Sequence, residues 1–212
     1  MIRTNRQVLR LHFEKNVNDA NNICVGGTTT NITYIDGKFG MAANIATTPS
    51  YISIPHNAIM STINTYNEIT ICCWAYHTSS NIGFLSAKEN EHFEVHTALN
   101  NNIRFIPTLN TYIDTPAQSF PLNTWCHIAC TYNSSNIGNI YINGAKQTVT
   151  QSRYDRRLSH IAIDVNKPWM VGARWNMQYQ YSGIIDDFIV FNKELKEPDI
   201  KRIMLGLHPI AV

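Results

Sequence analysis

Charge is scarce in this sequence. Acidic and basic residues make up only 15% of its 212 residues, against about 25% in ordinary soluble proteins. The net charge of +2 is too small to favour a nucleic-acid partner. No segment approaches the ~18 consecutive apolar residues that a membrane-spanning helix needs, so no membrane insertion is expected.

The usual motifs of catalysis and of tight metal binding are also missing. There is no glycine-rich phosphate loop, no nucleophile elbow and no zinc-ligand spacing. The five cysteines are odd in number, and none belongs to a CxxC pair. The basic start at Met1 is not followed by an apolar run, so no secretory signal is expected. The sequence thus predicts a soluble chain from a reducing compartment, with reduced, buried thiols.

What the sequence does contain is alternation with a period of two. Short runs rich in β-branched and aromatic residues are separated by clusters of Gly, Pro, Asn and Ser, a pattern typical of a sandwich or barrel. The predicted strands include residues 51–54, 68–76, 93–96, 103–106, 125–132, 139–144, 170–172 and 184–191.

Turn and helix signals complete this outline. Asn143-Gly144 predicts a hairpin because both residues tolerate positive φ, and Asp36-Gly37 predicts a second one. Helical periodicity is confined to residues 193–204, where Leu195, Ile200 and Ile203 share a face and Pro198 suits a first turn.

The order of five motifs along the chain resembles the laminin-G-like jelly-roll family of the concanavalin A-like superfamily. The resemblance covers roughly residues 8–205 and implies an all-β, two-sheet antiparallel jelly-roll sandwich with one short C-terminal helix. It implies a single domain over residues 1–212. Leu11-His-Phe13, Asp19 and Phe39–Ala42 fit the family's opening strands, and the five motifs are Ile69–Trp74, Asn123–Tyr132, Ile140–Gly144, Val171-Gly172 and Tyr181–Leu195.

Large aromatic residues are expected to fill the space between the two sheets. Trp74 and Trp125 supply the apolar area that such a core needs. His127 shares the strand face of Trp125 and is predicted to be a hydrogen-bonded core residue. Cys126 and Cys130 lie on the opposite face, where they are interpreted as small hydrophobic residues.

Asp186 is the candidate metal ligand. In the superfamily that the chain resembles, the matching aspartate of the closing strand often binds a structural Ca²⁺, completed by backbone carbonyls. Here the resemblance implies Asp186 with Glu14 and Gly40, because a hard cation needs oxygen ligands. The alternative is that Asp186 only accepts hydrogen bonds from backbone amides. Asp187 is expected to face the other way.

The loop before the closing strand is the candidate ligand site. Aromatic rings cover the C–H face of a sugar while amides pair with its hydroxyls. The alternatives are an aromatic lid over the sandwich rim and a protein contact, and the basic run 153–157 is a possible neighbour. The candidate residues are Arg174, Trp175, Asn176, Gln178, Tyr179 and Tyr181.

A third cluster, Glu89, Glu91 and Glu94, resembles the catalytic signature of the related glucanases. Its middle residue departs from that signature, which has aspartate there. The resemblance places Glu89 and Glu91 in a loop, where two carboxyl groups cannot flank a glycosidic bond. Catalysis is therefore not expected.

Three functions remain in order of preference. The first is a non-catalytic module that recognises a glycan or a protein surface. The second is a structural component of a larger assembly, such as a virion decoration, fibre or minor capsid protein, whose partners are other subunits of the viral particle. The third is a glucanase-like hydrolase.

Overall fold

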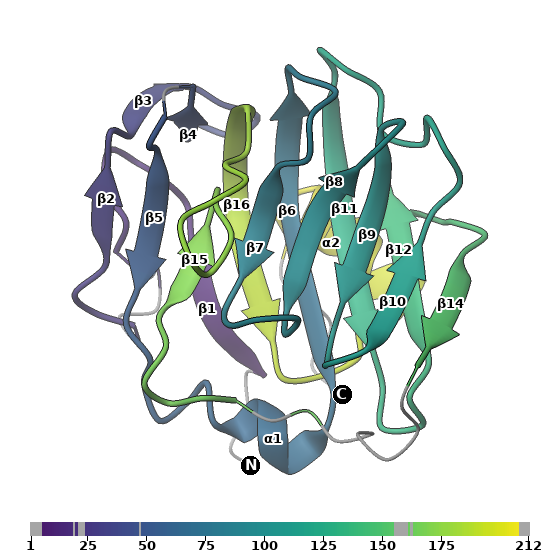
Figure 1. The fold of residues 1–212 in the computed structure, drawn as a ribbon. Helices are drawn as coiled ribbons and strands as arrows, with labels where there is room; N and C mark the ends of the chain where they lie inside the picture. Colours follow the sequence, from purple (N-terminus) through teal and green to yellow (C-terminus); the bar gives the residue numbers. More distant parts are fainter. Residues whose placement is uncertain are drawn as a thin grey trace.

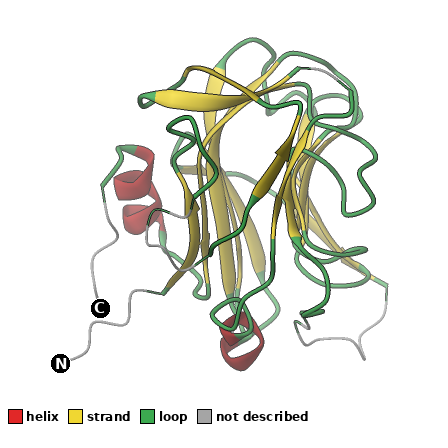
Figure 2. Ribbon diagram, turned by 90° about the vertical axis from the view of Figure 1, so that its left-hand side faces the viewer, coloured by secondary structure: helices red, strands yellow, loops and turns green. Residues whose placement is uncertain are grey.

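The computed structural model describes residues 6–18, 20, 24–46, 48–154, 161 and 163–207. Within these residues, sixteen strands form two sheets of eight, and the pairings between strands are antiparallel. The sheets face each other as two layers (Figures 1 and 2). This confirms the predicted all-β, two-sheet antiparallel sandwich.

Sheet A holds the strands that carry most of the sequence motifs. Its order is β13 (Ala145–Lys146), β12 (Gly138–Ile142), β11 (Trp125–Tyr132), β6 (Ile69–His77), β16 (Gly183–Phe191), β4 (Met41–Ile45) and β3 (Thr33–Asp36), with β1 (Gln7–Leu11) also paired to β16.

Sheet B forms the other layer. Its order is β14 (Thr150–Arg153), β10 (Thr111–Asp114), β9 (Asn102–Ile106), β8 (Glu94–Ala98), β7 (Phe84–Ala87), β15 (Trp169–Val171), β5 (Tyr51–Ile54) and β2 (Thr28–Thr30). The predicted hairpin at Asn143-Gly144 joins β12 to β13, with both residues at positive φ, and the one at Asp36-Gly37 joins β3 to β4.

Alternate side chains from both sheets fill the space between them. Cys73 and Ala75 of β6, Val95 of β8 and Phe105 of β9 belong to this core. The tryptophan of the core is Trp169, which is fully buried and donates its Nε1–H to Ser86 Oγ at 3.0 Å. Its polar atom is thereby satisfied while the ring is removed from water.

Trp74 and Trp125 do not lie between the sheets, so that prediction was wrong. Trp74 points to the outer face of sheet A, where its ring contacts Phe39 and His127 at centroid distances of 6.3 and 5.5 Å. Trp125 is half-buried on the same face, 5.7 Å from the ring of Tyr76. Trp74 is nevertheless only 7% exposed, because other segments cover this face.

The C-terminal helix α2 (Glu197–Met204) covers part of that outer face (Figure 2). Pro198 lies in its first turn, as predicted. A second helix, α1 (Thr62–Tyr66), was not predicted and lies at the lower end of the sandwich (Figure 1). Neither helix of the described residues is long and apolar enough to cross a membrane. The cluster under α2 consists of Cys72, Ala129, Tyr141, Ile189, Phe191, Leu195, Ile200 and Ile203.

All five cysteines are buried, as predicted. Cys73, Cys126 and Cys130 face the core between the sheets, whereas Cys72 lies beneath α2. Burial raises the pKa of Cys73 to about 12, which keeps this thiol protonated and unreactive.

The closing strand β16 has an irregularity at its centre. One edge pairs with β6 throughout, while the other pairs first with β4 and then with β1. The register shifts between Asp186 and Ile189, and Asp187 has a φ of +46°. These are the marks of a β-bulge, and it lies at the junction where β4 ends and β1 begins.

Candidate functional site

The predicted ligand loop forms a compact turn between β15 and β16. Arg174 N–H donates to Gln178 O at 2.9 Å, and Met177 N–H donates to Arg174 O at 2.8 Å. Met177 and Tyr179 have positive φ. In this conformation both side chains project outward, and each is about half exposed, at 50% and 52%.

The loop is fixed to the outer face of sheet B. Phe84 N–H donates to Tyr179 O at 3.0 Å, and the two rings lie 6.1 Å apart. The guanidinium of Arg174 lies 5.7 Å from the centre of the Phe84 ring. The loop therefore extends the surface of β7 with one exposed tyrosine.

An ion pair holds the loop to β8. Arg174 Nε donates to Glu94 Oε1 at 3.2 Å, and its Nη2 donates to Asn90 Oδ1 at 3.1 Å. The Glu94 side chain is only 1% exposed, and Glu91 N–H also reaches it at 3.3 Å. Burial raises the pKa of Glu94, while Arg174 opposes that rise. Arg174 thus favours the charged form of this buried carboxyl group.

His96 lies at the centre of this face. Its ring stacks on Phe84 at 4.4 Å and 20°, and its Nδ1 lies 2.9 Å from Thr97 O. Burial lowers the pKa of His96 to about 4, so the ring is neutral at pH 7. Because a carbonyl can only accept, Nδ1 carries the proton and Nε2 is left as an acceptor.

A second aromatic group lies farther along the same face. Arg104 of β9 binds Asp114 of β10 through two hydrogen bonds, at 2.7 and 3.1 Å. Beside this pair, Tyr112 meets Tyr154 edge-on at 5.6 Å. Tyr154 is 78% exposed. Sequence reasoning missed His96, Arg104 and Asp114, because polar residues on alternating strands look like ordinary solvated positions.

The structure divides the predicted loop residues into two groups. Gln178 and Tyr179 are exposed, and Gln178 Oε1 accepts a 2.9 Å hydrogen bond from Asn176 Nδ2. Arg174, Trp175 and Asn176 are half-buried. Of the basic run, residues 155–157 lie outside the described residues.

Tyr181, which was predicted to bind a ligand as an exposed loop residue, is buried. It is 1% exposed, and its ring stacks on His77 at 5.2 Å. The reason is register: Tyr181 continues the alternation of β16, in which Ile185 also faces the core. A ligand at the surface cannot reach it.

The three glutamates of the glucanase-like cluster have different partners. Glu89 accepts from Asp164 N–H at 2.9 Å, Glu91 accepts from Asn110 N–H at 3.2 Å, and Glu94 binds Arg174. Glu89 and Glu91 lie in the turn between β7 and β8, as expected. Each carboxylate holds a neighbouring segment in place.

Asp186 and Glu14 both bind the turn between β3 and β4. Asp186 is fully buried, and its two oxygens accept from Phe39 N–H at 2.9 Å and from Asp187 N–H at 2.8 Å. Glu14 accepts from Met41 N–H at 3.1 Å. At Gly40, with φ +61°, a Cβ would lie 2.1 Å from the Glu14 carboxylate. Asp186 and Glu14 thus bind the amides on either side of Gly40, which brings the three predicted residues to one turn.

This donor set fits a calcium ion poorly. Ca²⁺ takes six to eight oxygen ligands, whereas the oxygens predicted as ligands already accept hydrogen bonds within the protein. These are the carboxylate of Asp186 and the backbone carbonyls of Glu14 and Gly40. Among the described residues, no group of three or more His, Cys, Asp or Glu could hold a metal. Burial raises the pKa of Asp186 to about 6, against the opposing effect of the Phe39 amide. The geometry favours the amide-acceptor alternative, and structural calcium stays a prediction.

Asp187 was expected to lie on the opposite face of the strand from Asp186, but the two side chains lie on the same face. Asp187 binds His12 and lies near Cys72 and His127, which are on the outer face of sheet A. Asp186 pairs with Trp74 and shares that face. The bulge explains the difference, because the extra residue interrupts the alternation.

Comparison with known proteins identifies one matching family. The family model described as "Concanavalin A-like lectin/glucanases superfamily" matches residues 46–201, well over half of the chain. No curated protein sequence gives a significant match.

Solved structures show the same fold at low sequence identity. Domain 4 of AbnA, a GH43 extracellular arabinanase from Geobacillus stearothermophilus solved with arabinotriose, has a TM-score of 0.68 and 18% identity, covering 92% of this chain and 96% of that one. The binding domain of Paraclostridial Mosquitocidal Protein 1 has a TM-score of 0.72 and 19% identity, covering 94% and 52%. Botulinum neurotoxin type C, described as interacting with two ganglioside molecules, has a TM-score of 0.68 and 14% identity. That comparison covers 95% of this chain and 51% of the toxin chain. The chain spans about half the length of these toxin domains. The jelly-roll sandwich is confirmed.

Proposed function

Because the chain belongs to the concanavalin A-like lectin/glucanases superfamily, we propose that it is a non-catalytic module that recognises a glycan on the outer face of sheet B. One observation carries this proposal. Two exposed rings, Tyr179 and Tyr154, border a row of immobilised polar groups in which Arg174 and Arg104 reach the surface and the buried His96 lies between them. This composition supports the recognition of a sugar.

The chemistry of recognition follows from the fixed partners of these groups. A sugar ring can place its C–H face on Tyr179 or Tyr154 and direct its hydroxyls to the polar row between them. Arg174 and Arg104 are held by Glu94 and Asp114, so little side-chain entropy is lost on binding. Since each of the two arginines is paired with a carboxylate, the surface suits an uncharged glycan.

The spacing of the strands suggests an extended ligand. Tyr179 lies beside Phe84 of β7, and Tyr154 lies beside Tyr112 of β10, three strands away. Neighbouring strands are about 4.8 Å apart, so the two rings are separated by roughly 14 Å across the sheet. An oligosaccharide of a few units can span that distance.

A binding role without catalysis is supported by the uses of the carboxylates. A retaining glycosidase needs two carboxyl groups ~5–5.5 Å apart, one of which acts as a nucleophile. Here Glu94 is engaged by Arg174, while Glu89 and Glu91 hold loop amides. Relatives in fold are described with arabinotriose and with gangliosides, and those ligands belong to those proteins. The role in a virion assembly stays a prediction, tested by co-purification with particles.

The test is a glycan array followed by calorimetry on the best ligand. We expect Tyr179→Ala to weaken glycan binding at least tenfold. The contact between the tyrosine ring and the C–H face of the sugar contributes about 1.4 kcal/mol or more to the binding free energy. Tyr66→Ala is the matched control, since Tyr66 is 40% exposed but belongs to α1 at the lower end of the sandwich (Figure 1), outside the outer face of sheet B. Binding that survives Tyr179→Ala and Tyr154→Ala together would reject this surface.

A further inference from the structure

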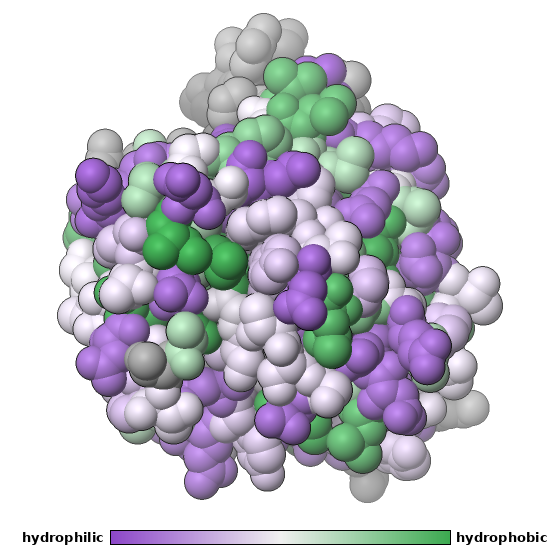
Figure 3. Space-filling view, turned by 90° about the horizontal axis from the view of Figure 1, so that it is seen from above, coloured by the Kyte–Doolittle hydropathy of each residue, from purple (hydrophilic) through white to green (hydrophobic). Residues whose placement is uncertain are grey.

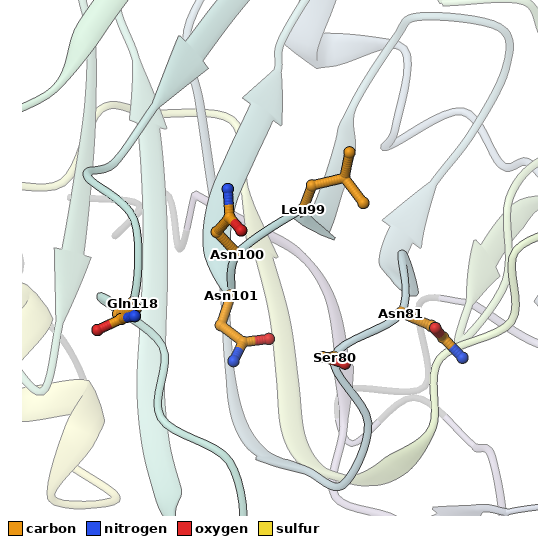
Figure 4. Close-up of a pocket in the computed structure, with 6 residues that line it drawn as sticks. All are labelled: Ser80, Asn81, Leu99, Asn100, Asn101 and Gln118. Carbon is orange, nitrogen blue, oxygen red and sulfur yellow. The ribbon is translucent and has the colours of Figure 1, made fainter.

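A hollow at the upper rim of the sandwich is separate from the face described above. It has a volume of about 550 Å³, which is within the range of ~300–1,000 Å³ typical of small-molecule sites. The loops between β6 and β7, between β8 and β9, and between β10 and β11 form its walls (Figure 4). Its lining consists of Ser80, Asn81, Leu99, Asn100, Asn101 and Gln118.

The lining has a distinctive chemistry. Four side-chain amides and one hydroxyl surround a single apolar residue, and none of these six residues is charged. Seen from above (Figure 3), this end of the molecule shows only small, separate hydrophobic patches between polar residues. The hollow therefore does not suit a large apolar partner, but it suits a small polar ligand with one apolar side.

Leu99 supplies that apolar side. It is 71% exposed, and an exposed leucine alone needs no explanation. In Figure 4 the Leu99 side chain extends into the space between the loops, with Asn101 and Ser80 below it and Asn81 on the far side. The Asn101 Oδ1 has no hydrogen-bond partner among the described residues. A buried acceptor without a partner costs free energy, which a ligand hydroxyl can recover after a small side-chain rotation.

The walls are held in place without any ligand. Gln118 N–H donates to Asn100 O at 2.7 Å, which joins two of the three loops. Thr97 Oγ1 donates to Asn81 O at 2.9 Å and accepts from Gly83 N–H at 2.8 Å. These bonds join the third loop, between β6 and β7, to strand β8. On the loops, these hydrogen bonds use backbone atoms only. The loop backbones are therefore held in place, and the side-chain amides of Asn81, Asn100 and Gln118 are not used in these bonds. Preorganisation of this kind lowers the entropy cost of binding.

We propose that the rim hollow binds one uncharged sugar residue, with the amides paired to its hydroxyls and Leu99 against its C–H face. An acidic sugar is disfavoured because burying its carboxylate beside neutral amides leaves the charge without a cation. The site shares no residue with the outer face of sheet B. The inference therefore stands or falls independently of the function proposed above.

The experiment is a titration followed by ¹H–¹⁵N spectra, in which side-chain amide signals report on the hollow directly. The probes are glucose, galactose, arabinose and N-acetylglucosamine, with sialic acid as the charged comparison. We expect at least one neutral sugar to shift the amide signals of Asn81, Asn100, Asn101 and Gln118 in a saturable way. Sialic acid should shift them weakly or not at all.

Leu99→Ala should weaken the affinity of that sugar about 3- to 10-fold, because the apolar contact is lost. The matched control is Leu205→Ala, since Leu205 is also largely exposed, at 62%, but follows α2 on the far side of sheet A. Asn100, Asn101 and Gln118 are left intact in these variants because each has positive φ, where substitution strains the backbone.

Three outcomes would overturn the proposal: silent amide signals with every neutral sugar, a response to sialic acid alone, or an unchanged affinity in Leu99→Ala. The ring signals of His96 separate the two sites. If an oligosaccharide shifts His96 while the rim amides stay silent, the outer face binds and the hollow does not. If the amides respond and His96 does not, the opposite holds.

Discussion

Removal of Arg174 is the most informative perturbation, because it leaves Glu94 buried without its cationic partner. Breaking a buried ion pair costs about 3–5 kcal/mol. The lower end applies here, since the Arg174 side chain is 25% exposed and Glu94 keeps the Glu91 amide at 3.3 Å. For a chain of this size, 1 kcal/mol shifts Tm by about 2–4 °C, so Arg174→Ala should lower Tm by roughly 6–12 °C at pH 7.

The loss should depend on pH. Burial already raises the pKa of Glu94, and removing Arg174 raises it further. A carboxyl group whose pKa is raised by folding contributes stability below its unfolded pKa of about 4.3, and this contribution disappears as pH rises through the folded value. The difference in Tm between wild type and Arg174→Ala should therefore be largest at neutral pH and shrink towards pH 4.

Thermal unfolding by circular dichroism at several pH values measures this effect. Arg104→Ala is the matched control on the same sheet face, because Arg104 and Asp114 are 38% and 23% exposed and such a pair contributes at most about 1 kcal/mol. Adding Glu94→Gln to Arg174→Ala should restore most of the lost stability. An equal loss in both arginine variants, or a loss that ignores pH, would refute the reasoning.

Three further predictions concern other parts of the molecule. If Asp186 binds calcium, about 1 mM Ca²⁺ should raise Tm relative to EDTA, and the rise should fade as pH drops through 6, the pKa of Asp186; an unchanged Tm at pH 7 would exclude the ion. Gly183→Ala should destabilise the fold by more than about 2 kcal/mol in urea unfolding, because its Cβ would lie 2.0 Å from Tyr76 O, whereas wild-type stability would mean that β16 lies differently. Tyr181→Phe should leave stability and glycan affinity unchanged, because the buried hydroxyl has no partner in the described structure; a loss of affinity measured by calorimetry would return Tyr181 to the binding site.

The sequence predicted strands well but could not identify which of their faces is inside. Strand β6 is buried at almost every position, because one face meets sheet B and the other meets Phe39 and α2. When both faces are covered, apolar residues no longer alternate with polar ones. Trp74 and Cys73 were therefore equally acceptable core residues, and the larger one was assigned to the wrong side.

The errors near the candidate sites have similar physical origins. Alternation predicts opposite directions for Asp186 and Asp187, but a bulge of one residue removes the rule locally. The rim hollow is assembled from three loops distant in sequence, and no periodic signal links Asn81, Asn100 and Gln118. By contrast, the exposed position of Tyr179 was predicted correctly, because it depends on the composition of one short loop.

The position of β16 affects how the molecule can be built during synthesis. This strand comes late in the chain, yet it lies inside sheet A, between β6 on one edge and β4 and β1 on the other. Until it emerges from the ribosome, those earlier strands present unpaired hydrogen-bonding edges to one another and to other chains. A nascent chain that stops before residue 183 would expose a ready template for aggregation, so chaperone protection should matter most during the final stage of translation.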